Sequence, residues 1–175
     1  MEQLDKKALI VIDMQNDFVC GALGTKEAED IVPKIKDRIL AARKEKYDLI
    51  FTRDTHDSNY LQTQEGKYLP IVHCLSESWG WQILSEISVN EAKIFNKSTF
   101  GSMELANYVR ERNYSSVELV GVCTDICVLT NAILIKTICP ELNVKVRGSC
   151  CAGVTPERHA VALIAMQACQ VELCD

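Results

Sequence analysis

Short apolar segments alternate with segments of helical period along the whole chain, and this alternation restricts the possible folds more than any other feature. Several of the short segments are apolar at successive positions, which is typical of strands buried on both faces of a parallel sheet. Segments of this kind occupy residues 8–13, 48–54, 92–97, 116–122, 143–148 and 170–173.

Between these segments, apolar residues recur every three or four positions, as they do on one face of a helix. In the first such segment Val32, Ile35 and Ile39 share a face, and we expect that helix to begin close to Pro33, because proline is tolerated near a helix start. The strand–helix order predicts one α/β domain over residues 1–175, with an open, mostly parallel six-stranded sheet and helices on both faces in a Rossmann-type three-layer arrangement. The other helices are expected around residues 105–109, 127–138 and 156–169.

The charge and the apolar content indicate an ordinary globular protein. A net charge of −5 argues against nucleic acid and anionic membranes as partners. The apolar run near the start, ALIVI, is too short for a signal peptide or a membrane span, so we expect a cytoplasmic protein. The sequence leaves the oligomeric state open, although its apolar helices would allow a homo-oligomer.

Nine cysteines are many for a chain of 175 residues. In a reducing compartment they are expected to be free thiols rather than disulfides, and no C-x-x-C pair indicates a zinc knuckle. Cys20, Cys139, Cys169 and Cys174 lie among apolar residues and are expected to be buried apolar side chains. The remaining question is whether any cysteine does chemistry.

Reactive side chains occur where the predicted strands end. Asp13, Asp54 and Lys97 end the first three strands, and the fourth is followed by Cys123. Ligands of open α/β sheets bind beyond the carboxyl ends of the strands, so these groups are expected at one rim. Each residue alone has a structural interpretation, as a turn residue or a solvated charge. The glycines form neither G-x-G-x-x-G nor a P-loop, which disfavours a nucleotide site.

The segment GVCTDIC holds two thiols in different positions. Thr124 is a candidate N-cap, which places Cys127 at the third position of the following helix. The helix dipole at that position lowers a thiol pKa and favours a nucleophile. The alternative is that Cys127 packs the helix against the sheet.

Residues 55–80 form an unusually long polar segment, and loops of that length are usually functional. Asp54 and His56 have a spacing that suits a divalent transition metal, and His73 and Glu65 supply two more ligand types. The alternative is a polar loop with histidines placed by chance.

These motifs together resemble the isochorismatase-like cysteine hydrolases, and within them the nicotinamidases. The resemblance covers the chain from about residue 7 to its end, and it rests on ALIVIDMQNDF, the D-x-H of RDTHD, KSTFGS and GVCTDIC. It implies that Asp13 is the general acid/base, Lys97 its charged partner and Cys127 the nucleophile. It also implies a cis peptide bond between Val122 and Cys123, with the backbone N–H groups of Cys123 and Cys127 directed at an oxyanion.

The same resemblance implies one divalent metal ion that binds the pyridine nitrogen of the substrate. Asp54, His56 and His73 match the family ligands. The remaining ligand is a histidine in many members and a glutamate in some, so Glu65 is the candidate here, with Gln62 or a water as alternatives. Zinc is the favoured metal, and iron or manganese would suit the same donors.

Phe18, Tyr68 and Phe100 are candidate walls of the substrate pocket, although an aromatic residue near the rim is more often part of the core. The segment before His73 and the following SESWGW depart from the family pattern and leave the substrate open.

The activity implied is hydrolysis of nicotinamide to nicotinate and ammonia through a thioester, a step of NAD salvage. The alternatives are a related amidase, a carbamoyl or ureido hydrolase, or a non-catalytic binding protein with this fold. Isochorismate hydrolysis is disfavoured because cleavage of a vinyl ether does not need the thiol.

Overall fold

The computed structural model describes residues 5–87 and 89–175 and contains one six-stranded sheet with the order β3-β2-β1-β4-β5-β6. Every strand pair in it is parallel, so the predicted α/β sheet is confirmed and is parallel throughout. The fifth strand continues four residues beyond its predicted end. The strands are β1 (Lys7–Ile12), β2 (Asp48–Asp54), β3 (Lys93–Lys97), β4 (Ser116–Val122), β5 (Asn143–Ala152) and β6 (Glu172–Cys174).

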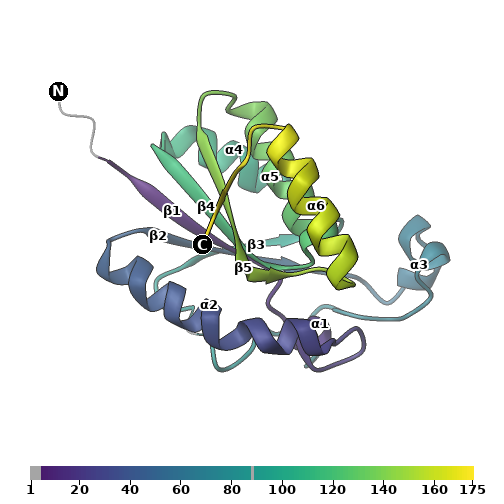
Figure 1. Ribbon diagram of the computed structural model, residues 1–175. Helices are drawn as coiled ribbons and strands as arrows, with labels where there is room; N and C mark the ends of the chain where they lie inside the picture. The colour runs from purple at the N-terminus through teal and green to yellow at the C-terminus, as the bar shows by residue number, and fades with distance from the viewer. Residues whose placement is uncertain (1–4, 88) are drawn as a thin grey trace.

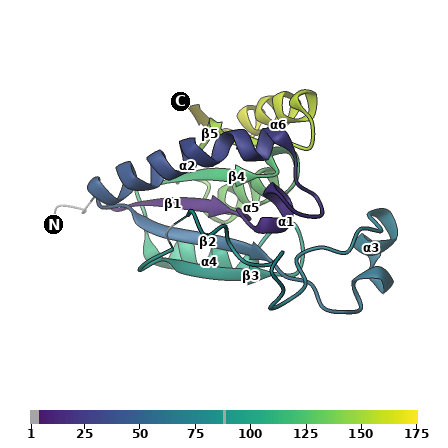
Figure 2. The same ribbon diagram turned by 90° about the horizontal axis from the view of Figure 1, so that it is seen from below.

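Helices cover both faces of the sheet (Figures 1 and 2). On one face lie α1 (Asn16–Val19) and α2 (Lys26–Lys44), whose apolar side chains pack on β1, β2 and β4. On the other face lie α4 (Met103–Arg112), α5 (Leu129–Ile138) and α6 (Pro156–Ala168). The central strand β1 is almost wholly buried between the two layers, as its apolar sequence predicts. Among the described residues, no helix is both long and apolar enough to span a membrane.

The first long helix, α2, begins well before Pro33, so the expected start near Pro33 is wrong. Its N-cap is Thr25, whose side-chain oxygen accepts a hydrogen bond from the Ala28 N–H at 3.1 Å. Pro33 and Glu29 are both exposed, so the backbone hydrogen bond that Pro33 cannot donate to Glu29 is lost on the exposed face of the helix. The proline is therefore tolerated inside the helix.

A buried carboxylate joins the two layers near the middle of β4. Glu118 is 4% exposed and accepts two hydrogen bonds from Arg38 of α2, both at 2.8 Å. Arg147 of β5 donates a third at 2.6 Å. Burial alone would raise the pKa of Glu118, but the two guanidinium groups outweigh it and hold the pKa below its usual value.

The order of the strands places a crevice at the centre of the sheet. The chain moves outward from β1 to β3 and then returns to β4 on the other side of β1, so the direction reverses between β1 and β4. Ligands of such sheets bind at the carboxyl ends of the strands beside this reversal. The strand ends that carry Asp13 and Cys123 are therefore neighbours.

The long segment after β2 lies beyond the same ends of the strands (Figures 1 and 2). It contains two short helices, the 3₁₀ turn η1 (Tyr60–Gln62) and α3 (Gln64–Tyr68), where the sequence predicts only a loop. Thr63 caps α3, because its hydroxyl oxygen accepts a hydrogen bond from the Gly66 N–H. Weak periodicity over so few residues gives no signal for helices of this length.

Candidate active site

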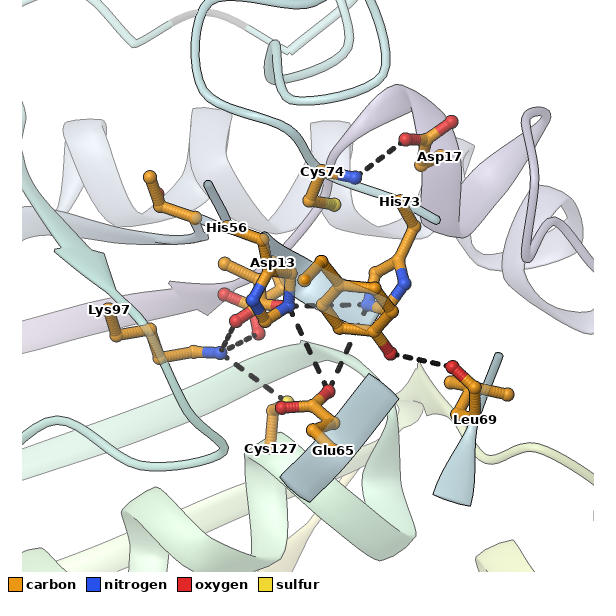
Figure 3. Close-up of polar contacts among 12 residues, drawn as sticks. Asp13, Asp17, His56, Glu65, Leu69, His73, Cys74, Lys97 and Cys127 are labelled. Carbon is orange, nitrogen blue, oxygen red and sulfur yellow. Dashed lines mark hydrogen bonds and ion pairs between the residues drawn. The ribbon is translucent and has the colours of Figure 1, made fainter. Parts of the chain in front are cut away.

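Asp13 and Lys97 form an ion pair that is shielded from solvent (Figure 3). Asp13 follows β1 and is fully buried, and its Oδ2 lies 2.7 Å from Nζ of Lys97 at the end of β3. The Thr52 hydroxyl donates to Asp13 Oδ1 at 2.6 Å and accepts from the Asp13 N–H at 3.2 Å. Three adjacent strands thus fix the position and the charge of one carboxylate.

Cys127 contacts the same ammonium group (Figure 3). Its Sγ is 3.5 Å from Lys97 Nζ, and the residue is 6% exposed. It belongs to a π-helical turn, η2 (Thr124–Val128), which follows β4 and precedes α5. The peptide bond between Val122 and Cys123 is cis. The Cys123 carbonyl accepts hydrogen bonds from the N–H groups of Ile126 and Val128, both at 3.1 Å.

The expected role of Thr124 as a helix cap is wrong. Cys123 occupies the cap position, and no side chain caps the turn. The Thr124 hydroxyl instead lies 2.8 Å from Nδ1 of His159 in α6. The local pattern of the sequence cannot show this, because His159 is 35 residues away.

The electrostatics of Cys127 also differ from the expectation. Burial raises the pKa of the Cys127 thiol well above its ordinary value, and the nearby Lys97 only partly opposes this. Burial likewise raises the pKa of Asp13, against the opposing effect of Lys97. For Lys97, burial would lower the pKa, but Asp13, Cys127 and Asp54 together raise it well above the usual value. The site therefore holds a protonated thiol beside a permanent ammonium, and a base must remove the thiol proton.

Four potential metal ligands converge beside this group, and all lie within the long segment or at its start (Figure 3). One ligand atom from each lies within 4.8 Å of the others. His56 Nε2 is 2.8 Å and His73 Nε2 is 3.6 Å from Asp54 Oδ2. The same two nitrogens lie 3.8 and 4.0 Å from Glu65 Oε1. The structure thus brings together all four predicted ligands: Asp54, His56, Glu65 and His73.

The donor set fits a divalent transition metal. His73 Nδ1 lies 2.8 Å from the Ile71 carbonyl, a contact that requires Nδ1 to carry a hydrogen, so Nε2 is the nitrogen that remains to bind a metal. His56 Nε2 is buried and makes no well-aligned hydrogen bond within residues 5–87 and 89–175. Two imidazole nitrogens and two carboxylates suit zinc, iron or manganese.

The charge of Asp54 agrees with a ligand role. Burial alone would raise the pKa of Asp54, but His56, His73 and Lys97 outweigh it and hold the pKa well below the usual value. Asp54 is therefore a carboxylate at neutral pH.

Tyr60 supports both histidines and is absent from the sequence predictions. Its ring centroid lies 4.6 Å from that of His56 and 4.9 Å from that of His73, and it is 1% exposed. Its hydroxyl donates to the Leu69 carbonyl at 2.9 Å, which ties η1 to the end of α3. Nothing in the pattern around Tyr60 predicts burial, so only the three-dimensional structure assigns it this position.

Gln15 and Asp17 hold the backbone of the ligand-bearing segments. The buried Gln15 accepts from the Asp54 N–H at 2.7 Å and donates to the Asp54 carbonyl at 2.9 Å. Asp17 accepts from the Cys74 N–H at 2.7 Å and so fixes the residue after His73 (Figure 3). Both lie in the segment MQNDF directly after Asp13, where adjacent polar residues at a strand end were the available signal.

A cavity of about 240 Å³ opens onto Cys127 and the metal-ligand set. Phe18 and Phe100 line it, as predicted. Tyr68 does not belong to its lining and is 83% exposed, so its assignment to the pocket is corrected. It lies on the outer side of α3, and the following residue, Leu69, lines the cavity instead.

The thiols outside the site divide into exposed and buried groups. Cys20 and Cys169 are exposed, so the expectation that they are buried apolar residues is wrong. Cys139 and Cys174 are partly exposed, and Cys74, Cys150 and Cys151 are buried. All nine cysteines are free.

Comparison with known proteins identifies the family. The model of the isochorismatase domain matches residues 7–175. The chain belongs to the isochorismatase family. Two curated proteins are similar to this chain over most of their length. The nicotinamidase of Saccharomyces cerevisiae is 27% identical, over 73% of this chain and 80% of that protein. The nicotinamidase/pyrazinamidase of Mycobacterium tuberculosis is 26% identical, over 95% of this chain and 97% of that protein.

Solved structures of similar proteins agree with the fold. The pyrazinamidase of Pyrococcus horikoshii in complex with zinc superposes with a TM-score of 0.86 and 26% identity, covering 97% of this chain and 99% of that one. The pyrazinamidase/nicotinamidase of Streptococcus mutans gives a TM-score of 0.87 and 28% identity, covering 97% of this chain and 100% of the other.

Proposed function

We propose that this protein is a cysteine amidohydrolase and that its substrate is nicotinamide, which it hydrolyses to nicotinate and ammonia. One observation carries the proposal: Cys127, which contacts the Asp13–Lys97 ion pair through Lys97, lines an apolar cavity that also opens onto three of the four convergent metal ligands, Asp54, Glu65 and His73. The nicotinamidases and pyrazinamidases among the similar proteins support the same substrate class.

The first half of the proposed reaction forms a thioester. Asp13 takes the proton of the Cys127 thiol, and the thiolate attacks the amide carbonyl carbon. The backbone N–H groups of Cys123 and Cys127 stabilise the oxyanion, and each such donor is typically worth about 10²–10³ in rate. Asp13 then returns the proton to the leaving nitrogen, which departs as ammonia. Lys97, which lies 2.7 Å away, opposes the effect of burial on the pKa of Asp13 and so favours its anionic form before the transfer.

The second half regenerates the enzyme. Asp13 takes a proton from a water molecule, the resulting hydroxide attacks the thioester carbonyl, and the carbon–sulfur bond breaks. The thiolate of Cys127 regains a proton from Asp13, and the carboxylic acid leaves as nicotinate. Asp13 thus serves as base and then as acid in each half of the reaction, and both Thr52 and Lys97 hold it in position.

Asp54, His56, Glu65 and His73 would hold one divalent metal ion in this proposal. A metal ion held there would act as a Lewis acid toward the ring nitrogen of a heteroaromatic amide. The side chains of Phe18 and Phe100, on the cavity lining, exclude water around a flat ring. His73 lies beside both the proposed metal site and Phe18, because it is one of the four candidate ligands and its ring centroid lies 5.5 Å from that of Phe18.

The test is an ammonia-release assay with nicotinamide, run on protein as purified, after chelation and after chelation with zinc, iron or manganese restored. We expect activity that falls on chelation and returns with metal. Activity on carbamoyl or ureido compounds but not on nicotinamide would assign the alternative substrate class within the family. No turnover of any amide, with an unreactive Cys127, would make the protein a binding protein.

A further inference from the structure

Two adjacent side chains of the turn that carries Cys127 contact the same distant segment, residues 153–159 at the start of α6. Asp125 Oδ1 accepts a hydrogen bond from the Val154 N–H at 3.0 Å, and Asp125 Oδ2 lies 2.6 Å from Arg158 Nε. Thr124 Oγ1 lies 2.8 Å from His159 Nδ1. The turn and the start of α6 are thus joined by three polar contacts, none of which serves the reaction steps above.

These contacts are shielded to different degrees. Thr124 is fully buried, and the side chain of Asp125 is 7% exposed, whereas that of Arg158 is 56% exposed. Both partners of Asp125 reach solvent, since Val154 is 39% exposed and Arg158 lies on the surface. The shielded end of both contacts is the carboxylate of Asp125.

The two elements approach so closely that only glycine fits at position 153. A Cβ atom there would lie 3.0 Å from Asp125 Oδ1 and 2.9 Å from the backbone nitrogen of His159. A side chain at Gly153 would therefore displace the backbone at His159, the carboxylate of Asp125, or both. The position of Asp125 beside the segment 153–159 is thus sensitive to any atom added at Gly153.

The same two elements form adjoining walls of the cavity. Cys123, Ile126 and Cys127 line it from the turn, and Gly153, Val154 and Arg158 line it from the segment 153–159. Asp125 is not part of the lining, but it belongs to the first wall and accepts a hydrogen bond from the second. Loss of that hydrogen bond would let the walls separate beside the thiol.

We propose that Asp125 is a positioning residue that fixes the width of the cavity at Cys127 through its hydrogen bond with Val154, and so restricts the site to flat amides of single-ring size. The restriction to flat amides rests on the proposed amidase function. The width of the cavity does not depend on that function, because access to the Cys127 thiol can be measured without turnover.

The experiment compares the alkylation rates of Cys127 by iodoacetamide and by the bulkier N-benzylmaleimide, followed by peptide mapping of the full-length protein. In the wild-type protein, Cys127 should react much faster with iodoacetamide than with N-benzylmaleimide. Asp125→Ala should reduce that preference by about tenfold, the effect of about 1.4 kcal/mol. Asp125→Asn keeps an oxygen that can accept from Val154, so it should restore most of the preference although it removes the ion pair with Arg158. Asp37→Ala, at an exposed aspartate in α2, is the matched control and should behave as wild type.

Gly153→Ala provides a second route if Asp125→Ala fails to fold, because it displaces the segment 153–159 while it keeps the carboxylate. We expect the same loss of preference for the small reagent. The proposal is overturned if Asp125→Ala and Gly153→Ala both keep the wild-type ratio, or if Asp125→Asn loses as much as Asp125→Ala.

A kinetic readout separates positioning from simple destabilisation. With nicotinamide, Asp125→Ala should raise KM and lower kcat, whereas larger aryl amides should lose less. An equal loss of kcat/KM for all substrates would overturn the proposal that Asp125 fixes the width of the cavity. If wild type shows no amidase activity, the proposed function fails, but the alkylation ratios still decide the role of Asp125.

Discussion

Lys97 Nζ lies 3.1 Å from Asp54 Oδ1, so one ammonium group joins the proposed catalytic residues to the proposed metal ligands. Lys97 also contacts Asp13 at 2.7 Å and Cys127 at 3.5 Å. Its side chain is 2% exposed, and the side chains of Asp13 and Asp54 are 0% and 5% exposed. The charge of Lys97 therefore offsets two buried carboxylates at once.

Replacing Lys97 by methionine should destabilise the fold as well as abolish activity. The substitution leaves two buried carboxylates without their cation, and the loss of one partner from a buried ion pair costs about 3–5 kcal/mol. Urea denaturation of the metal-free protein measures the free energy of unfolding. Lys97→Arg keeps the charge and is the control. A methionine variant as stable as wild type would show that Lys97 does not offset both charges.

Cys127→Ala should abolish ammonia release while the free energy of unfolding changes little. Cys123→Ala should keep substantial activity, because only the backbone N–H of Cys123 is used in the proposed reaction. Burial raises the pKa of both thiols, so the assignment rests on geometry, because it is Cys127 whose Sγ lies 3.5 Å from Lys97 Nζ. Steady-state kinetics of the two variants provide the measurement. Equal loss in both, or an active Cys127→Ala variant, would contradict the assignment.

Asp13→Asn should reduce kcat by orders of magnitude with a modest change in KM, because it keeps the size of the side chain but removes the base. Thr52→Val is a useful comparison, since it removes the hydroxyl at 2.6 Å that orients the carboxylate and leaves the charge. We expect a smaller loss of kcat in Thr52→Val. A larger loss there than in Asp13→Asn would assign Asp13 a structural role.

The sequence predicted the sheet and its rim because strand ends are local features. Asp13, Asp54 and Lys97 follow or end apolar runs. Parallel strand pairing places such residues at one edge of the sheet, whatever the conformation of the connecting loops. The metal ligands were likewise marked by residue type, at Asp54-x-His56 and in the one long polar segment.

The supporting residues were not predicted, because their roles depend on contacts between distant segments. Tyr60 packs on two histidines, and Thr124 contacts His159 rather than capping its own turn. The raised pKa of the Cys127 thiol was missed for the same reason: the helix dipole is a local effect, but burial depends on the whole fold. Tyr68 shows the opposite error, since an aromatic residue near the site faces solvent.

Purified protein should contain one divalent metal ion per chain, and His56→Ala should reduce its metal content sharply. Glu65→Ala should also lose metal, because its carboxylate lies 3.8 and 4.0 Å from the two imidazole nitrogens. Gln62→Ala is the matched control on the neighbouring turn, and it should retain metal because Gln62 is exposed. Elemental analysis after reconstitution gives the stoichiometry. A wild-type protein without metal after refolding with excess zinc, iron or manganese would leave the long segment as a lid alone.

Chelation should reduce turnover of nicotinamide far more than turnover of benzamide, which lacks the ring nitrogen. The proposed metal orients the substrate, and Asp13 and Cys127 carry the bond-breaking steps. Parallel assays of both amides before and after chelation provide the comparison. Equal losses for the two amides would show that the metal does not act through the ring nitrogen.

The stability of the protein should fall in acid through Glu118, far from the catalytic residues. The pKa of Glu118 is lower in the folded protein than in the unfolded chain, where a glutamate titrates near about 4.3. Its contribution is therefore complete above that unfolded value and is lost as the pH falls through the lower folded value. At pH 7, Glu118→Gln should lower the free energy of unfolding by about 3–5 kcal/mol, because Arg38 and Arg147 keep their charges without a partner. At pH 3 the same substitution should lower it much less. Urea denaturation at both values measures the difference. Glu141→Gln, at an exposed glutamate, is the control and should leave the pH dependence unchanged. An equal loss at pH 7 and pH 3 would show that the role of Glu118 is one of packing rather than of charge.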